Sequence, residues 1–227
     1  MTGLADVTWP EVPAHATVLV PVGSTEQHGP HLPLDTDTVI ATAVCQLVAE
    51  RLDRGAVLIA PPVAVGASGE HQSFAGTVSI GTDVLRLVIV ELVRSVRTWA
   101  DRVVLVNGHG GNVAALDGAV GQLRFEGHDV RWLPCAVTGL DLHAGHAETS
   151  MLLHLCPDRV RLDRAAAGNT GTLEQLLPTL RGRGVAAVSP NGVLGDPAGA
   201  SAAHGAILLD AIARSLVDRL QSAGVAP

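Results

Sequence analysis

Residues 23–37, GSTEQHGPHLPLDTD, decide how this chain folds and where its chemistry lies. They follow an apolar run, residues 17–22, that is typical of a buried strand, and a helical pattern begins directly after them. Pro30 and Pro33 stiffen the loop. Its candidate cation ligands are Glu26, His28, His31, Asp35 and Asp37. Open α/β sheets bind ligands in loops at the carboxyl ends of strands, so we predict a ligand-bearing loop here rather than a plain surface loop with a capping aspartate.

Composition narrows the class of protein. The chain has 227 residues, of which 47% are hydrophobic and 16% charged, so it can bury a sizeable core and disorder is not expected. The net charge of −7 and the lack of a basic stripe argue against a nucleic-acid partner. All its basic residues are arginine, which rules out a lysine nucleophile, a Schiff-base cofactor and a P-loop lysine.

The cysteines and the N-terminus indicate the compartment. Cys45, Cys135 and Cys156 lie far apart without a CxxC pair, which indicates reduced thiols rather than a disulfide framework. The N-terminus lacks a basic segment followed by an apolar one, so no signal peptide is expected. No apolar run reaches the length of a membrane span. We therefore predict a cytoplasmic protein without a membrane partner.

Strand patterns alternate with helix patterns along the chain. Strands are predicted at residues 17–22, 57–65, 102–106 and 128–133. Helices are predicted at residues 38–52, 82–100, 113–125, 147–155, 173–177 and 200–220. This alternation favours parallel pairing and a three-layer α/β/α sandwich with a mostly parallel central sheet. No repeat or linker interrupts residues 1–227, so we expect a single domain.

Particular residues set the expected boundaries of these elements. Pro61 and Pro62 should bend the second strand or leave it at a sheet edge. Thr82 is a plausible cap for the second helix. The buried face of that helix is predicted to carry Leu85, Val88, Leu92 and Val96. Pro178 should end the helix that begins at Leu173. Residues 1–15 are expected to form an irregular lead-in.

A histidine stands in the glycine-rich turn after the third predicted strand. His109 lies within residues 107–112, NGHGGN, where glycines let the backbone approach a ligand closely. A tight strand-to-helix turn or an anion-binding loop would also need such glycines. Neither alternative explains the central histidine, so we predict that His109 is a metal ligand.

Further donors follow the fourth predicted strand. They are Asp141, His143, His146, Glu148 and His154. His146 and Glu148 are two positions apart and cannot share one face of a helix. His143 and Glu148 can both point inward if the helix begins between them. His154 lies among leucines and is expected to be a packed or surface residue.

The second glycine-rich loop, residues 66–81, contains Glu70 and His71. We interpret both as substrate contacts, with an ordinary mobile polar loop as the alternative. Three histidines, His15, His128 and His204, do not belong to a cluster of donors and receive no role.

These donors together suit a pair of divalent ions. A bridging aspartate holds two cations about 3.5–4 Å apart, and water between them becomes a nucleophile near neutral pH. Such a site hydrolyses amides, with a nearby histidine protonating the departing amine. A serine mechanism is the competing interpretation, but the chain contains no GxSxG motif.

These motifs resemble the creatininase (creatinine amidohydrolase) family of two-metal amidohydrolases. The matching stretches are residues 23–38, 76–82, 106–112 and 143–150, and the general pattern covers nearly the whole chain. The resemblance implies a three-layer α/β/α fold and a homo-oligomer, either a hexamer or an octamer.

The resemblance also implies roles for individual residues. Its metal ligands fall on Glu26, His28, Asp37 and His109, with Asp37 bridging. Creatinine hydrolases carry a further glutamate where this chain has Gly111, which weakens a creatinine substrate, and Glu148 is the best local replacement as ligand and catalytic group. His143 falls on the proton-shuttling histidine. Substrate contacts are expected at Glu70, His71, Gly110, Gly111 and Asp141.

The family member that these motifs match most fully is a peptidase. The resemblance implies that it hydrolyses a modified precursor peptide and releases the C-terminal Val-Tyr dipeptide core. Another amidohydrolase of the family, acting on creatinine or on a formamide, is the alternative. A non-catalytic assembly protein with a structural metal is a third reading, disfavoured by the intact ligand set. The expected cofactors are two divalent ions per chain, Zn²⁺ and Fe²⁺ first, with Mn²⁺ also compatible with mixed oxygen and nitrogen ligands.

Overall fold

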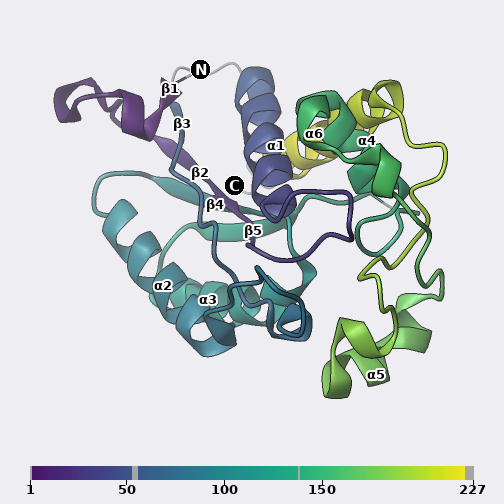
Figure 1. Ribbon diagram of the computed structural model, residues 1–227. Helices are drawn as coiled ribbons and strands as arrows, with labels where there is room; N and C mark the ends of the chain where they lie inside the picture. Colours follow the sequence, from purple (N-terminus) through teal and green to yellow (C-terminus); the bar gives the residue numbers. More distant parts are fainter. Residues whose placement is uncertain (1, 53–55, 138, 223–227) are drawn as a thin grey trace.

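The computed structural model describes residues 2–52, 56–137 and 139–222. Within these residues a parallel five-stranded sheet lies between two layers of helices (Figure 1). The strands, in spatial order, are β1 (Thr2–Gly3), β3 (Val57–Ile59), β2 (Thr17–Val22), β4 (Arg102–Asn107) and β5 (Val130–Pro134). The helices are α1 (Thr36–Leu52), α2 (Gly81–Val96), α3 (Val113–Phe125), α4 (His146–Leu155), α5 (Leu173–Arg183) and α6 (Ala202–Ser222). The predicted α/β/α sandwich is confirmed.

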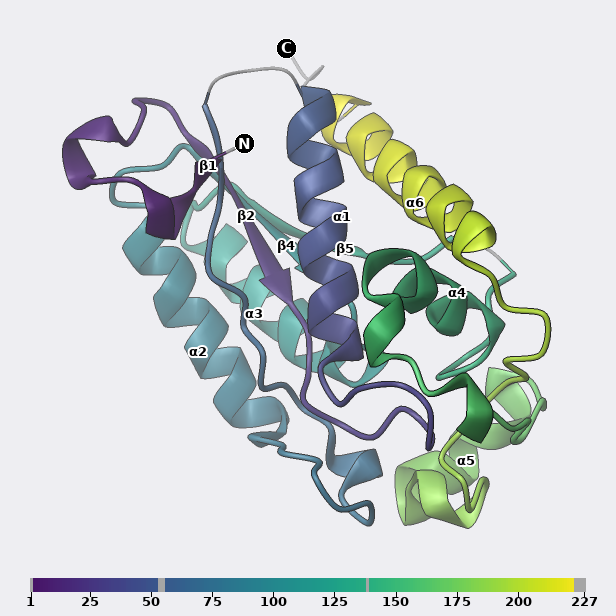
Figure 2. The same ribbon diagram turned by 45° about the horizontal axis from the view of Figure 1, so that its top comes forward.

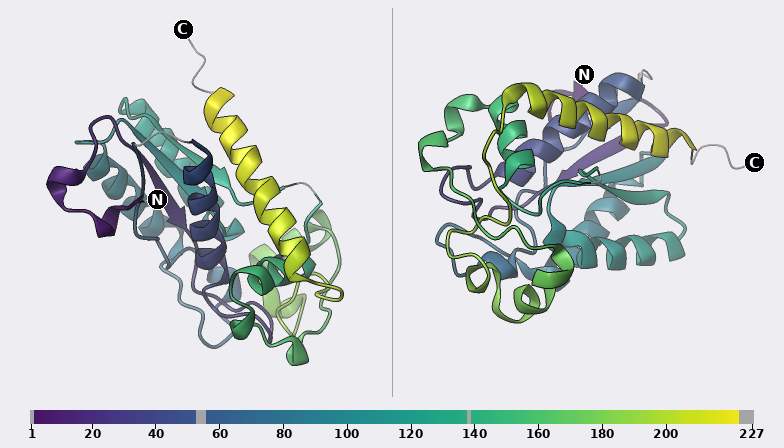
Figure 3. Two further views of the ribbon diagram at one scale, coloured as in Figure 1. Left: turned by 90° about the horizontal axis from the view of Figure 1, so that it is seen from above. Right: turned by 90° about the vertical axis from the view of Figure 1, so that its right-hand side faces the viewer.

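Alternating strand residues build the two cores of the sandwich. Leu19 and Val104 point to one face of the sheet, where α1, α4 and α6 cover them. Val18 and Val103 point to the other face, where they pack against α2 and α3. The two layers stand on opposite sides of the sheet in Figure 3. Because both faces are covered, the strands are nearly continuous apolar runs, as parallel sheets require.

The register of the two central strands positions the loops that carry the site. β2 and β4 pair in parallel from Thr17 opposite Arg102 to Val22 opposite Asn107, so their carboxyl ends are level. The next residues, Gly23 and Gly108, let the start of α1 come very close. A Cβ on Gly23 would stand 2.6 Å from the backbone nitrogen of Thr38, and one on Gly108 would stand 2.5 Å from the carbonyl oxygen of Asp37. Glycine at both strand ends therefore places the first turn of α1 over the sheet edge.

The second strand is shorter than predicted. β3 ends at Ile59, before the two prolines, and Val63 returns only as an isolated bridge to Val22. The prolines interrupt the ladder because they cannot donate hydrogen bonds. The expectation of a wholly irregular lead-in was wrong, because Thr2 and Gly3 form the edge strand β1 beside β3.

Two details of α2 differ from the prediction. The helix begins at Gly81 without a side-chain cap, so Thr82 is a helical residue and not the cap. The buried stripe consists of Leu85, Ile89, Val90, Val93 and Val96. Val88 is 40% exposed, because the sheet-facing positions in this part of the helix are Ile89 and Val93, one residue later than predicted.

The prediction that Pro178 ends its helix was also wrong. α5 continues through Pro178 to Arg183, and Gly184, with φ of 73°, ends it instead. Pro178 is exposed, so the carbonyl that loses its hydrogen bond can turn to water. Figure 2 shows α5 apart from the two helical layers, beyond the end toward which β2 points. None of the described helices combines the length and hydropathy that a membrane span needs.

Candidate metal centre

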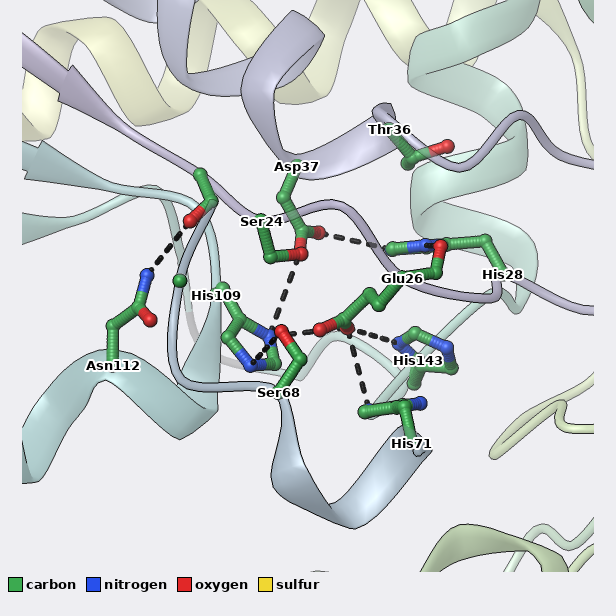
Figure 4. A network of polar contacts seen from close by, with 12 residues as sticks. Ser24, Glu26, His28, Thr36, Asp37, Ser68, His71, His109, Asn112 and His143 are labelled. Carbon is green, nitrogen blue, oxygen red and sulfur yellow. Dashed lines mark hydrogen bonds and ion pairs between the residues drawn. The ribbon is translucent and has the colours of Figure 1, made fainter. Parts of the chain in front are cut away.

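Four segments of the chain bring their polar side chains together at the carboxyl edge of the sheet (Figure 4). The loop after β2 and the start of α1 supply Glu26, His28 and Asp37, and the turn after β4 supplies His109. These four side chains are all at least 95% buried. The other donors in this cluster, which we call the donor cluster, are His71, His143 and Glu148.

Asp37 lies at the middle of the donor cluster. Its Oδ1 is 3.0 Å from His28 Nε2, and its Oδ2 is 3.4 Å from His109 Nδ1. Ser24 Oγ donates a hydrogen bond of 2.7 Å to Oδ2, which fixes the carboxylate. Asp35, by contrast, is half-exposed and pairs with Arg159 at 2.6 Å. Of these two aspartates, Asp37 is therefore the one that faces imidazoles on two sides, as a bridging carboxylate must.

Glu26 is a buried carboxylate without hydrogen bonds. Its side chain is fully buried, and neither oxygen has a hydrogen-bond partner among the described residues. Its Oε1 lies 3.1 Å from His109 Nδ1 and 3.3 Å from His71 Nε2. A carboxylate removed from water needs compensation by a positive charge. Glu26 is therefore a strong candidate for holding a cation.

Glu148 reaches the donor cluster from the first turn of α4. Its Oε2 accepts a hydrogen bond of 2.6 Å from the Ala144 amide and lies 3.8 Å from His28 Nε2. The helix begins at His146, between His143 and Glu148, so both side chains point inward. This is the arrangement that the sequence predicts.

The charges of the donor cluster shift its pKa values strongly. Burial lowers the pKa of His28, but Asp37, Glu148 and Glu26 outweigh it and raise that pKa to about 10. Likewise, burial is outweighed at His109, where Glu26 and Asp37 raise the pKa to about 9. Burial raises the pKa of Glu148 to about 7, against the attraction of His28. The carboxylates thus hold protons on their imidazoles, and a bound divalent cation would replace those protons.

The donor atoms form overlapping sets of metal-binding size. Three sets have one donor atom from each residue within 4.8 Å of the others: Glu26 with His28 and Asp37, Glu26 with His71 and His143, and His28 with His143 and Glu148. Imidazole nitrogen with carboxylate oxygen suits zinc, iron(II) and manganese. The residues present therefore fit a centre for divalent ions.

Gln27 holds two of the histidines in place. Its Nε2 lies 2.8 Å from His71 Nδ1 and 3.0 Å from His143 Nε2, and it donates to the carbonyl of Gly192. His143 Nε2 is also 2.8 Å from the carbonyl oxygen of Gln27. A carbonyl only accepts, so Nε2 carries the proton and Nδ1 is left facing Glu26. The sequence prediction missed Gln27, whose one signal was its position between two candidate ligands.

Burial and neighbouring imidazoles keep these two histidines neutral. The pKa of His71 falls to about 4, chiefly through burial against the opposing attraction of Glu26. Burial, His28 and His71 hold the pKa of His143 well below its usual range. Of the two neutral imidazoles, His143 turns its unprotonated Nδ1 toward Glu26. His71 Nδ1 accepts from the Gln27 amide, so its Nε2 carries the proton and faces Glu26.

A cavity of about 1010 Å³ opens from the donor cluster. Of the predicted substrate contacts, Glu70, His71, Gly110 and Gly111 line it, together with Asp37, His109, His143 and Glu148. Asp141 does not line it. Its Oδ1 accepts from the Ala147 amide at 3.1 Å and supports the start of α4, so its expected contact with substrate has no support here.

The remaining histidines lie outside the cavity. His146 Nε2 is 2.7 Å from His204 Nδ1, a pair that the sequence prediction did not connect. His31, part of the ligand-rich loop, is buried and bonds to Thr149 Oγ1 at 2.9 Å. His154 is exposed, in agreement with the prediction.

Comparisons with known proteins point to one family. A sequence model of creatininase, described as creatinine amidohydrolase, matches residues 5–220. The mycofactocin precursor peptide peptidase of Mycobacterium ulcerans (strain Agy99) is 56% identical over 94% of this chain and 85% of its own length.

Solved structures agree with this match. A mutant creatininase complexed with creatine has a TM-score of 0.82 and 28% identity, covering 100% of this chain and 99% of its own. A mutant creatininase of Zn-Zn type has a TM-score of 0.80 and 28% identity, covering 96% of both chains.

Proposed function

This chain belongs to the creatininase family and hydrolyses carbon–nitrogen bonds, and from that premise we propose that it is a metal-dependent peptidase of mycofactocin biosynthesis. Its substrate is the modified precursor peptide, from which it releases the C-terminal Val-Tyr dipeptide core. The observation that carries this proposal is the 56% identity to a precursor peptide peptidase over 94% of this chain, against 33% to a creatinine amidohydrolase over 71% of it.

The cavity supports a peptide substrate over creatinine. Its volume of about 1010 Å³ lies at the upper end of the usual range for ligand pockets, about 300–1,000 Å³. Gly111 lines it where creatinine hydrolases carry a glutamate. The length of the cavity, which runs from the donor cluster to α5, leaves room for a chain longer than creatinine.

We assign the metal ligands from the geometry of the donor cluster. Glu26, His28, Asp37 and His109 would hold divalent ions, with Asp37 as the bridging ligand and Glu148 as a further ligand beside His28. Bound there, the ions would polarise the scissile carbonyl and make a water molecule nucleophilic near neutral pH. The protein residues place this site at the end of the cavity.

We assign the proton transfers to His143. Its Nε2–H is held by the carbonyl of Gln27, so its Nδ1 is the nitrogen that can take up a proton. Nδ1 accepts the proton that the attacking water loses and delivers it to the departing amine. A neutral imidazole at the start of the cycle suits this role because Nδ1 must be empty to accept.

The metals are proposed to be zinc and iron(II), with manganese as the alternative. Mixed nitrogen and oxygen donors accept all three ions. A related creatininase is of Zn-Zn type, which supports zinc in at least one site.

We also propose a cytoplasmic, single-domain homo-oligomer, a hexamer or octamer. An exposed apolar stripe on α2, formed by Val84, Leu87 and Val88, supports a contact between copies. Their exposed fractions are 50%, 53% and 40%, on the side of α2 that faces away from the sheet. Light scattering tests this surface by comparing the mass of the Leu87→Glu variant with that of the unaltered protein. An unchanged mass of the assembly would contradict a contact between copies through this stripe.

A cleavage assay tests the proposed function. The precursor peptide, first modified by its radical-SAM enzyme, is incubated with the purified protein, and products are identified by mass spectrometry. We expect release of the dipeptide core, with creatinine untouched. Turnover of creatinine without cleavage of the peptide would overturn the proposal.

A further inference from the structure

The cavity extends well beyond the donor cluster. One end is lined by Asp37, His109 and Glu148, and the other by one face of α5 and the residues after it. We call this second end the α5 rim and define it as Leu173, Leu177, Leu180, Arg181 and Arg183. Nothing assigned so far uses these side chains.

The α5 rim is held against the site by a close backbone contact. A Cβ on Gly184, directly after α5, would stand 2.7 Å from the carbonyl oxygen of Glu70. The carboxylate of Glu70 is in turn 3.5 Å from His109 Nε2. The last turn of α5 therefore stands next to the donor cluster, although it is far from it in sequence.

Arg181 and Arg183 carry charges that the described part of the chain does not neutralise. Both side chains are exposed, and no carboxylate of the described residues lies within 4 Å of either guanidinium. Arg219 on α6 also lacks such a partner among the described residues, so what sets Arg181 and Arg183 apart is their place in the lining of the cavity. Cations at the end of a helix complement its dipole. The helix dipole does not explain why both arginine side chains line a cavity beside three leucines. Their positive charges also contrast with the net charge of −7 of the whole protein.

We propose that the α5 rim binds an acidic stretch of the peptide substrate, with a carboxylate between the two guanidinium groups and apolar side chains on the leucines. Guanidinium pairs carboxylate in a planar, forked geometry, and the leucines bury side chains next to it. The inference rests on the proposed peptidase function and identifies the α5 rim as the surface that selects the peptide substrate. The carboxylate comes either from an acidic side chain or from the chain terminus.

The test uses Arg181→Gln with Arg183→Gln in the whole enzyme. Arg219→Gln is the matched control, an exposed arginine on α6 outside the cavity. We expect the double variant to bind a fluorescently labelled precursor peptide about 10- to 100-fold more weakly, as for lost charged hydrogen bonds. Its metal content and kcat should stay those of the unaltered enzyme, and the control should bind normally.

Two altered peptides locate the carboxylate. If it belongs to an acidic side chain, replacing Asp and Glu of the peptide by Asn and Gln should abolish the difference between enzyme and double variant. If the carboxylate is the C-terminus of the peptide, a peptide with a C-terminal amide should abolish that difference. Equal binding of the precursor peptide to the unaltered enzyme and to the double variant would overturn the proposal that the α5 rim binds the substrate. Normal binding without cleavage by the unaltered enzyme would instead overturn the proposed peptidase function, so the two failures are distinct.

A separate observation concerns the space beside Gly111. A Cβ there would stand 2.4 Å from His109 Nε2 and 2.5 Å from Glu70 Oε1. The place is therefore already taken by the carboxylate of Glu70, which arrives from the short turn Gly69–His71. Position 111 and Glu70 fit each other only because position 111 is glycine.

The two nitrogens of His109 face different partners. Nδ1 points to Glu26 and Asp37, at 3.1 and 3.4 Å. Nε2 points to the carbonyl of Ala67 at 3.4 Å, to Ser68 Oγ at 3.5 Å and to the carboxylate of Glu70 at 3.5 Å. A metal ligand whose other nitrogen donates to a carbonyl or carboxylate is fixed in tautomer and orientation.

We infer that Glu70 is a positioning residue for His109 and not only a substrate contact. Its carboxylate, with the carbonyl of Ala67, keeps the proton of His109 on Nε2 and leaves Nδ1 free to bind a metal. It acts from the position where creatinine hydrolases place a glutamate on the turn after β4.

Metal affinity tests this inference without reference to activity. Competition with a chelator should show that Glu70→Ala binds zinc about 10- to 100-fold more weakly, the range usual for such supporting groups. Glu70→Gln should restore part of the affinity, because its carbonyl still accepts from Nε2. Gly111→Ala should weaken binding as well, because its Cβ would meet both His109 Nε2 and the carboxylate of Glu70. Glu174→Ala, on the exposed side of α5, is the control. Unchanged zinc affinity in Glu70→Ala would overturn the inference and leave Glu70 as a substrate contact.

Discussion

The donor cluster and the α5 rim face the same cavity but are held in place differently. The donor cluster sits on level strand ends, where Gly23 and Gly108 admit the first turn of α1 to within contact distance. The α5 rim rests on a small core of Leu176, Val185 and Leu194, separate from the two main cores. Rigid strand ends suit chemistry that depends on exact distances. A helix on a small core suits selection of a flexible chain, because it can shift at a lower cost than a strand end held in the sheet. It stays linked to the donor cluster through the backbone pairing of Leu194 with His143.

The largest effect is expected when the central residue of the donor cluster is removed. Asp37→Ala should lose both metal ions and all turnover, because Asp37 alone faces both His28 and His109. Metal analysis and the cleavage assay measure this. Asp35→Ala is the matched control and should keep metal and much activity, since Asp35 pairs with Arg159 on the surface. Reversed behaviour of the two variants would show that the bridging residue is Asp35.

A smaller loss of metal is expected at Glu148. Glu148→Gln keeps the acceptor for the Ala144 amide but removes the negative charge near His28. Metal content should therefore fall to nearer one ion per chain while the fold persists. If the variant retained two ions at unchanged affinity, Glu148 would not be a ligand.

His143 should affect the reaction without emptying the site. We expect His143→Ala to keep both ions and to lose about 10²–10⁴-fold in kcat, the usual contribution of general acid–base catalysis. His146→Ala, which breaks the pair with His204 and the contact with the Ala198 carbonyl outside the cavity, should lose much less. Since His143 Nδ1 also stands among the donor sets, an empty metal site in His143→Ala would make it a ligand and move the proton transfer elsewhere.

The smallest effect is expected from loosening the α5 rim. Leu176→Ala removes a side chain that is 8% exposed from the small core. A buried leucine truncated to alanine costs about 2–5 kcal/mol, here mostly in local stability. KM for the peptide should rise several-fold while metal content and kcat hold. Leu162→Ala, at a position 52% exposed, should change neither quantity, and loss of metal in Leu176→Ala would contradict the separation of the two regions.

The sequence predicted the donor cluster well because its information is local. Glu26, His28 and Asp37 lie within one motif after an apolar run, and His109 stands in a glycine turn after another. Parallel strands bring such turns to one edge. The start of α4 between His143 and Glu148 followed from the spacing of those residues. These predictions needed only strand ends and helix periodicity.

The parts that were missed depend on contacts between distant segments. Gln27 matters because it reaches His71, His143 and Gly192, and no local pattern signals that. The substrate contact expected at Asp141 had no support because its oxygen instead accepts from Ala147. The continuation of α5 through Pro178 depends on an exposed position that tolerates a missing hydrogen bond.

Metal analysis of protein purified without oxygen, joined to the peptide-cleavage assay, tests the two-metal centre most directly. We expect up to two divalent ions per chain, loss of cleavage on chelation, and recovery when zinc and iron(II) are returned. Full hydrolysis of the precursor peptide by protein shown to be free of metal would contradict the proposed centre at Glu26, His28, Asp37 and His109.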